Sequence, residues 1–451
     1  MSNALLHRRR LSRLVTLLVV SQIIMLAYGI FLFLRSGRFP VPVFYDPYDT
    51  FMDFFNTNYW AVHAGRYDVW HSIYPIFTFV LGAAMTPARC VSQLSSVGIR
   101  TCASDSIGWI VAAYLAGAWV CALVVTRKLD ETWPRRWWRV PVLTFVFALA
   151  APALFAVERG NYIVIVFLCL GLSELSGRDW KGALLLALAI NLKQYLVVLW
   201  LAPFLKRRFD YLALSVMMAL AINWISSIAL PDVHYSMLFE NMAGFSTGAS
   251  TSYFEKMWYA TSFSAWVKAI DNSPWVGRLS PLLFSLGSLG VYSLRWISLA
   301  LVGVSLLLLA RDRDQISWEE ISFVSLVSLM MLTDSIGGYA LILAFPVAAV
   351  LVGRGRFEGM LVCLFILVTP LDFPVGPSHI ERAWGYLIGR RSDYIASLSL
   401  GAYIRPFALL YLLWAFMLPQ LREAAKTYLA VARRESDAPL TRGSNEQHTH
   451  G

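Results

Sequence analysis

Charged side chains are scarce in this sequence of 451 residues: Lys, Arg, Asp and Glu make up only 15%, whereas hydrophobic residues make up 58%. A soluble domain has about a quarter of its residues charged and about half apolar. This difference excludes a soluble enzyme, a nucleic-acid-binding protein and a disordered protein. The net charge of +10 does not indicate nucleic acid, because loop Lys and Arg of a membrane protein mainly set its orientation. We therefore expect an all-α, polytopic bundle of transmembrane helices that binds no nucleic acid.

The sequence also lacks several motifs of soluble chemistry. It has no Walker loop, no GxGxxG after a predicted strand and no HExxH, so a nucleotide-driven pump is excluded. It has five cysteines and no CxxC. Only Cys90 and Cys102 share a loop outside a clear apolar run. They could form a disulfide if that loop faces an oxidising compartment.

Apolar runs recur along most of the chain. They are Leu14–Leu34, Ser106–Thr126, Val140–Val157, Asn161–Ser173, Gly182–Leu205, Tyr211–Leu230, Leu286–Ala310, Ile321–Thr333, Ile336–Val352, Phe357–Leu371 and Ile395–Leu418. The first is long enough to span a bilayer. No small-residue cleavage site follows it, which favours a retained helix over a signal peptide.

Basic segments predict which way the helices point, because short loops rich in Lys and Arg face the cytoplasm. These segments are Arg127–Arg139, Arg178–Lys181, Lys206–Arg208, Arg311–Arg313, Arg354–Arg356 and the tail from Arg422. All these basic segments face the cytoplasm if the chain crosses the membrane about twelve times. This requires that Ile73–Ala88 does not cross the membrane and that Gly182–Leu205 enters it and turns back at Lys193. Both termini are then cytoplasmic, in a plasma (inner) membrane protein. We expect one transmembrane domain (1–434), with outer loops 35–105 and 231–278, and a disordered tail (435–451).

The first outer loop carries paired carboxylates in an aromatic stretch. Asp46 precedes Pro47, which is typical of a helix cap, and Gly65 is typical of a helix stop. The predicted helix, 47–64, is amphipathic and lies on the membrane surface. Asp49 and Asp53 share one of its faces. They are either a solvated face or bases whose pKa the surrounding rings raise.

Three further segments interrupt apolar runs with polar residues. Tyr74-Pro75 opens a second surface or re-entrant helix. Glu158-Arg159-Gly160-Asn161 stands between two runs almost without a loop. Charged groups so near hydrocarbon usually mark a site, although an interfacial Glu–Arg pair that caps helix ends is the alternative.

Lys193 lies between Asn191 and Gln194 in the middle of an uncharged stretch. So deep a Lys needs an anion, carbonyl groups or water, although a Lys that snorkels to the surface is the alternative. Half-helices that meet at a charged turn are typical of cavities for polar ligands. Asp334-Ser-Ile-Gly-Gly-Tyr339 breaks another run in the same way, unless it is a plain tight turn.

These segments, taken in order, resemble the motifs of a known family. They are Asp53-Phe54 with Tyr59-Trp60-Ala61 and Gly65-Arg66-Tyr67, then Ser72-Ile73-Tyr74-Pro75, Arg159-Gly160-Asn161, Leu192-Lys193, and Asp334–Tyr339 followed by Pro346. The pattern covers Phe51–Pro346 and is similar to the multi-span glycosyltransferases of the GT-C type, close to family 87, which are polyprenol-phosphate-mannose-dependent mannosyltransferases. Ile76 and Gln194 stand where that family has prolines.

The resemblance implies transfer of a hexose such as mannose, with inversion, from a polyprenyl-phosphate donor in the membrane lipid to an outer-face glycan or glycolipid. Beyond this donor substrate it assigns no cofactor, no residue is assigned as a metal ligand, and a requirement for a metal ion stays open. Asp53 would act as the general base, with Asp49 as the alternative. The other residues would bind substrate: Lys193 and Arg159 the donor phosphate, Asn161, Gln194 and Tyr74 the sugar or phosphate, and Glu158, Asp334 and Tyr339 in unassigned substrate roles.

Two other functions stay open at this point. A transporter or flippase for a lipid-linked sugar would also need split helices and a buried cation, but it usually has pseudo-symmetric halves, which this sequence lacks. A non-catalytic subunit of a polysaccharide assembly complex would not depend on the acidic loop. An enzyme, in contrast, predicts a deep outer-face cavity that holds Asp53, Arg159 and Lys193 together.

Overall fold

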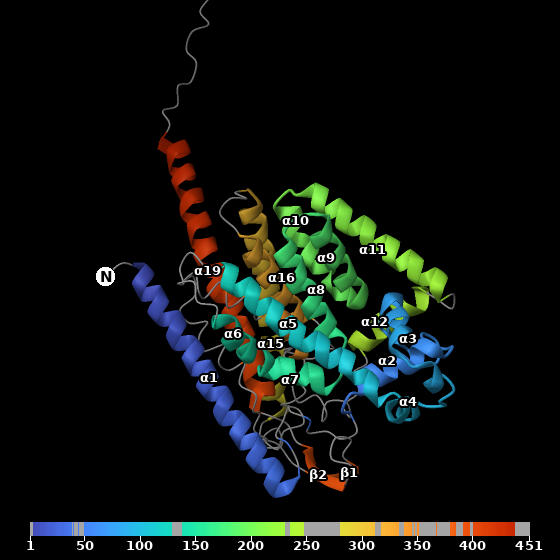
Figure 1. The fold of residues 1–451 in the computed structure, drawn as a ribbon. Helices are drawn as coiled ribbons and strands as arrows, with labels where there is room; N and C mark the ends of the chain where they lie inside the picture. Colours follow the sequence, from blue (N-terminus) through green and yellow to red (C-terminus); the bar gives the residue numbers. More distant parts are fainter. Residues whose placement is uncertain are drawn as a thin grey trace, which may run out of the picture.

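The computed structural model describes residues 3–37, 39, 44, 49–128, 138–230, 235–247, 280–311, 317–332, 338–344, 347, 350, 367, 379–384, 391–396 and 400–437. These residues are almost entirely helical, as predicted (Figure 1). The α-helices are α1 (Asn3–Ser36), α2 (Met52–Val62), α3 (Ile76–Met85), α4 (Ser96–Cys102), α5 (Ile107–Lys128), α6 (Arg139–Ala148), α7 (Ala151–Glu158), α8 (Ile163–Ser176), α9 (Trp180–Leu192), α10 (Leu201–Leu205), α11 (Phe209–Ala229), α12 (Tyr235–Thr247), α15 (Pro281–Arg311), α16 (Trp318–Leu332) and α19 (Leu400–Asp437). The 3₁₀ helices are η1 (Ala88–Cys90), η2 (Ser104–Ser106), η3 (Gln194–Trp200) and η5 (Gly338–Leu343).

Five of the described helices are long and apolar enough to cross a membrane. The spans are Val15–Arg35, Ser104–Lys128, Phe209–Ala229, Pro281–Leu307 and Tyr403–Glu423. Large apolar side chains on them are exposed, as Leu17 of α1 and Trp224 of α11 are, which suits helices that face lipid. The count rises to six if the bent pair α6 and α7 is one span. The total of about twelve crossings stays a prediction.

Two of the predicted apolar runs are broken in the structure. Val140–Val157 is not one straight helix, since α6 and α7 meet at a 59° bend. Pro152 lies in the first turn of α7, where a missing N–H is tolerated, and so it starts a new helix there. Gly182–Leu205 breaks at Lys193, as predicted: α9 ends at Leu192 and η3 begins at Gln194.

The core lies where α8 packs against α5 on one side and α9 on the other. Two glycines allow α5 and α8 to approach closely. A Cβ at Gly117 would lie 2.8 Å from the Phe167 ring, and a Cβ at Gly171 would lie 2.8 Å from Val120. Small residues at such contacts are typical of membrane helix pairs, because they let the backbones pack tightly.

An ion-pair network marks one end of this core. Lys128, at the end of α5, pairs with Glu174 of α8 at 2.7 Å and with Glu319 of α16 at 2.5 Å. The start of α8 is at the opposite end, about 20 Å away for a helix of its length. The helices α2, α3 and α4, which follow α1 in the chain, gather at that opposite end, at the lower right of Figure 1.

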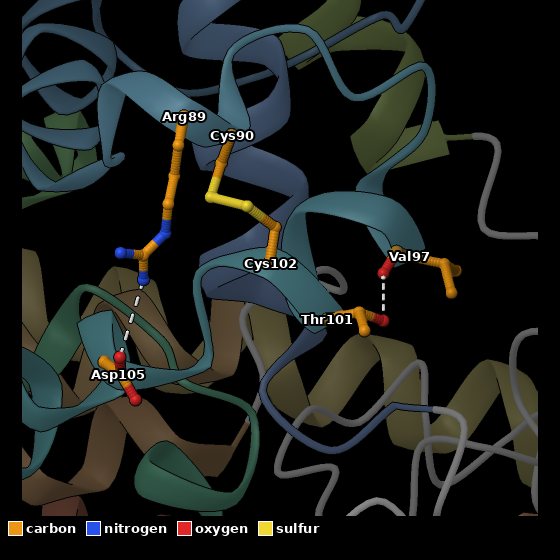
Figure 2. Close-up of a disulfide and its surroundings, with 6 residues drawn as sticks. All are labelled: Arg89, Cys90, Val97, Thr101, Cys102 and Asp105. Carbon is orange, nitrogen blue, oxygen red and sulfur yellow. Dashed lines mark hydrogen bonds and ion pairs between the residues drawn. A yellow bond between two sulfur atoms is a disulfide. The ribbon is translucent and has the colours of Figure 1, made fainter.

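A disulfide between Cys90 and Cys102 closes a short loop at that end (Figure 2). The sequence left open whether these two cysteines are bonded, and in the structure they are. Ser95 caps α4 inside the loop by accepting a hydrogen bond from Gly98 N at 3.1 Å. The loop also packs on α2, where the Tyr59 hydroxyl donates to Leu94 O at 3.0 Å. The bond thus fixes a segment that touches α2.

The helix predicted at 47–64 is shorter and differently placed. It is α2, Met52–Val62, and Asp49 lies in the turn before it. Asp46 and Pro47 lie outside the described residues, and Phe51, not an aspartate, occupies the N-cap position with a φ of 60°. The helix ends before the predicted stop at Gly65. Phe54 and Phe55 are both fully buried, and α2 packs against α3 and α4.

The last part of the described chain contains a short hairpin and a long helix. An antiparallel hairpin of β1 (His379–Trp384) and β2 (Arg391–Ala396) adds two strands to an otherwise helical fold. β2 contains Ile395, so the last apolar helix starts at Leu400 and not at Ile395. α19 then continues to Asp437, and the domain boundary expected at 434 stays a prediction. Most of the runs 336–352 and 357–371 lies outside the described residues.

Candidate active site

The turn between α7 and α8 holds the start of α2. Phe51 N donates to Glu158 O at 2.7 Å, and Asp53 N donates to Arg159 O at 3.0 Å. Gly160 in this turn has a φ of +63°, and a Cβ there would lie 2.9 Å from Phe54 Cβ and 3.1 Å from Phe51 Cα. Only glycine fits, because both the backbone conformation and the close approach exclude a side chain. The Arg-Gly-Asn segment is therefore a docking surface for the acidic loop.

Arg159 forms ion pairs with both predicted carboxylates. Its Nη1 lies 2.6 Å from Asp49 Oδ2, and its Nη2 lies 2.9 Å from Asp53 Oδ1. Asn161 Nδ2 donates to the other Asp53 oxygen at 2.7 Å, and Asn161 Oδ1 accepts from Ile163 N at 3.0 Å. Since Asn161 is fully buried and bonded through both ends of its amide, it holds Asp53 in one orientation.

These partners change the acidity of Asp53 in the direction opposite to the predicted one. Burial raises the pKa of this carboxyl, as expected for a group near aromatic rings. The charge of Arg159, the hydrogen bonds from Arg159 and Asn161, and the charge of Lys193 together outweigh burial and hold the pKa below its ordinary value of 3.8. The aromatic rings alone would raise the pKa of Asp53, but the Arg159 guanidinium and the other polar partners together lower it by more.

Lys193 lies at the break between α9 and η3 and is only 4% exposed. Its Nζ is 4.2 Å from the centre of the Tyr74 ring and 6.0 Å from that of Tyr339. No carboxylate of the described residues forms an ion pair with it. A buried ammonium that faces aromatic rings, and that no carboxylate of the described residues pairs with, is suited to bind an anion.

Backbone contacts hold the Lys193 break against the start of α3. The Thr78 hydroxyl donates to Leu192 O at 3.1 Å, and Gln194 Nε2 donates to Ile73 O at 2.6 Å. The Gln194 amide is therefore engaged in positioning the chain. On the other side, the Tyr67 hydroxyl donates to Tyr74 O at 3.0 Å. Tyr74-Pro75 directly precedes α3, as predicted, and presents its ring to Lys193.

Most of the predicted site residues thus lie at one end of the bundle. Asp49, Asp53, Arg159 and Asn161 are in direct contact, and Lys193 is near enough to lower the pKa of Asp53. Glu158 is fully buried and contributes its backbone oxygen to Phe51. Asp334 lies outside the described residues.

Asn241 of α12 is a site neighbour that sequence reasoning missed. Its side-chain amide donates to Tyr67 O at 2.8 Å and to Ser72 O at 3.2 Å, and so it ties α12 to the turn before Tyr74. No pattern around Asn241 indicated this contact, because it depends on how α12 packs against the segment between α2 and α3.

A small hollow lies apart from these residues. Its lining includes Lys128, Glu174 and Trp318, so it is at the end of the core that carries the ion-pair network. Asp53, Arg159 and Lys193 do not line it. Within the described part of the chain, no three His, Cys, Asp or Glu residues gather in a group that could hold a metal ion.

We expect Gly160→Ala to displace α2 and abolish any activity that needs Asp53. Gly177→Ala is the matched control, because Gly177 also has a positive φ (+83°) but its Cβ would meet nothing within 4 Å. Both variants carry backbone strain, on the order of 1–3 kcal/mol. Thermal unfolding and an activity assay on both should show lost stability in each and lost activity in Gly160→Ala alone. Equal activity in the two variants would contradict the docking role of the turn.

The sequence of this chain matches the model of a known protein family. The sequence model of glycosyltransferase family 87 matches residues 73–333. Tyr74, Arg159, Asn161 and Lys193 lie within the match, and Asp49 and Asp53 precede it. No curated protein and no solved structure matches the chain. Since the match covers more than half of the 451 residues, and the chain has several membrane-spanning helices, this membrane protein belongs to glycosyltransferase family 87.

Proposed function

We propose that this glycosyltransferase transfers a hexose, such as mannose, from a polyprenyl-phosphate donor to a hydroxyl of an outer-face glycan or glycolipid. The observation that carries the proposal is the meeting of a carboxylate, Asp53, with Arg159 and Asn161, beside the buried cation Lys193. One base and two cations suit the transfer of a sugar from a phosphate. A flippase would not need a carboxylate oriented by two donors.

The reaction proposed is a single displacement with inversion. Asp53 takes the proton of the acceptor hydroxyl, and the hydroxyl oxygen bonds to the anomeric carbon. The bond from that carbon to the phosphate oxygen breaks, and its electrons leave with polyprenyl phosphate. Negative charge grows on the leaving phosphate, and cations held in a site of low dielectric constant stabilise it. Arg159 and Lys193 supply those cations, and Asn161 holds the base in place.

The ion pair between Arg159 and Asp53 has a consequence for this chemistry. A carboxylate whose pKa is lowered is always ionised near neutral pH but holds a proton weakly. A donor phosphate would compete with Asp53 for the Arg159 guanidinium, because phosphate accepts two parallel hydrogen bonds from Arg. Asp53 would then lose its strongest stabilising partner and become more basic while the donor is bound.

We expect Asp53→Asn to keep the fold and lose transfer. The amide keeps the shape of the side chain but cannot accept the proton, and loss of a general base typically costs about 10²–10⁴-fold in rate. Asp49→Asn is the matched control, since Asp49 contacts Arg159 but not Asn161. The test is the turnover of purified variants with a panel of polyprenyl-phosphate sugars. Normal turnover by Asp53→Asn with an inactive Asp49→Asn would move the base to Asp49.

The pH dependence of kcat/KM should report the free Asp53 carboxylate. Because its pKa lies below 3.8, Asp53 stays ionised and its titration causes no loss of activity between about pH 8 and about pH 5. Arg159→Gln removes the positive charge that lowers the Asp53 pKa most strongly, so this pKa rises and the acid limb of the pH profile moves to higher pH. Asp49→Asn should not move it upward. An acid limb that is the same in wild type and Arg159→Gln would show that Arg159 does not control the base.

We expect Lys193→Met to insert and fold but lose donor binding and turnover together. Met keeps the length of the side chain and removes the charge that would face the phosphate. Lys193→Arg should keep part of the activity, because the charge remains in a different geometry. Lys181→Met is the control, since Lys181 is an exposed Lys at the other end of α9. Binding of a polyprenyl-phosphate sugar by Lys193→Met at wild-type affinity would remove the phosphate role.

We propose further that the site faces outward and that both termini are cytoplasmic, in the plasma (inner) membrane. Two observations support this orientation. The Cys90–Cys102 bond lies at the Asp53 end, and disulfides persist in oxidising compartments. Arg127, Lys128 and the basic segment 178–181 lie at the Lys128 end, which is where short cytoplasmic loops are expected.

Labelling of single cysteines should establish the two faces. Asp68 and Lys181 are both exposed and lie at opposite ends of the bundle. In a Cys363→Ser background, an impermeant maleimide added to intact cells should label Asp68→Cys and not Lys181→Cys. Cys121 and Cys169 are buried and should stay unlabelled. The reverse pattern would place the site on the cytoplasmic face.

A further inference from the structure

The loop closed by the disulfide exposes a group of aliphatic side chains. Leu94 is 90% exposed, Val97 is 60% exposed and Val91 is 42% exposed. The segment 91–99 contains no charged residue. Val97 points away from the Cys90–Cys102 bond (Figure 2), while Ile99 on the same helix is fully buried against the protein. α4 thus has one side in the core, and the exposed apolar group consists of Val97 of α4 with Val91 and Leu94 of the segment before it.

The loop is rigid and is joined directly to a membrane span. The disulfide, the Ser95 cap and the bond from Tyr59 to Leu94 O hold its backbone in place. Only Ala103 separates α4 from the span that begins at Ser104. A seven-residue helix is about 10 Å long, so every residue of α4 lies close to the start of the span, and the headgroup region there is about 5–8 Å thick. The apolar group is therefore within reach of the membrane surface.

Two further residues mark the level of that surface. Trp109, in the first turn of α5, is 66% exposed, and exposed Trp side chains concentrate at the boundary between lipid and water. Arg89 lies beside the disulfide with its side chain 65% exposed, and its only ion pair among the described residues is a long one, 3.6 Å, to the exposed Asp105 (Figure 2). Such a pair is weak, so Arg89 is available to a lipid phosphate.

We propose that the disulfide loop inserts Val91, Leu94 and Val97 into the lipid headgroup region beside the start of α5. The occupant of this apolar face is the membrane, because the face continues from a membrane span without a linker. The loop would then act as a lateral anchor. Through the hydrogen bond between Tyr59 and Leu94 O, it would hold α2, which carries Asp53, at a fixed height above the bilayer. This inference does not depend on which reaction the site performs.

The test is photocrosslinking of the full-length protein in vesicles of phosphatidylcholine and phosphatidylglycerol. A benzophenone amino acid replaces Leu94, and the lipid adducts are measured by mass spectrometry. Leu115, 51% exposed within the α5 span, is the positive control, and the exposed Asp68 is the negative control. We expect lipid adducts at position 94 in a yield close to that at 115 and several-fold above that at 68.

The other outcomes overturn the proposal. A yield at 94 equal to that at 68 would show that the loop stands in water. Adducts of twice the protein mass at 94, without lipid adducts, would show that the face binds a second copy of the chain. A second measurement uses Leu94→Asp and its matched control Ser92→Asp, which adds the same charge to the same loop. With a photolabel placed at Val97, Leu94→Asp should lower the lipid adduct yield and Ser92→Asp should not; equal yields would contradict insertion by Leu94.

Discussion

The site depends on one interaction, the double ion pair of the Arg159 guanidinium with Asp49 and Asp53. It brings a turn between two core helices and the start of a loop helix into one unit. The backbone bonds from Phe51 and Asp53 to the same turn add to this attachment. They require Gly160, because any side chain there would meet the backbone of α2. Without this docking, the acidic loop would have no fixed position relative to Lys193.

The site is built on broken helices, and there is a physical reason for this. A long helix satisfies all its backbone groups internally, but it cannot bring polar side chains together from several directions near hydrocarbon. The breaks at Gly160 and Lys193 free backbone and side-chain groups at the end of the bundle. Thr78, Gln194 and Asn241 then satisfy the backbone groups around the Tyr74 turn and the Lys193 break. The uninterrupted helices α1, α11 and α15 carry the lipid-facing surface instead.

Several features of the site could be predicted from the sequence because they depend on short-range patterns. A Lys in an uncharged run predicted the break at Lys193, and the charged turn at 158–161 predicted a site between two helices. Tyr74-Pro75 predicted the start of α3, since proline suits the beginning of a helix. The start of α2 and the low pKa of Asp53 could not be predicted in this way. Both depend on a turn more than a hundred residues further along the chain.

The sequence by itself determined that the chain is a helical membrane protein, where its apolar runs break, and which charged residues lie in those breaks. These properties follow from hydropathy and from the cost of charge in hydrocarbon, which act locally. Only the tertiary structure decided which charges meet. It placed Arg159 and not Lys193 on Asp53, closed the bond between Cys90 and Cys102, and laid Asn241 over the Tyr74 turn. Such contacts join residues distant in sequence, and their geometry follows from the packing of the helices between them.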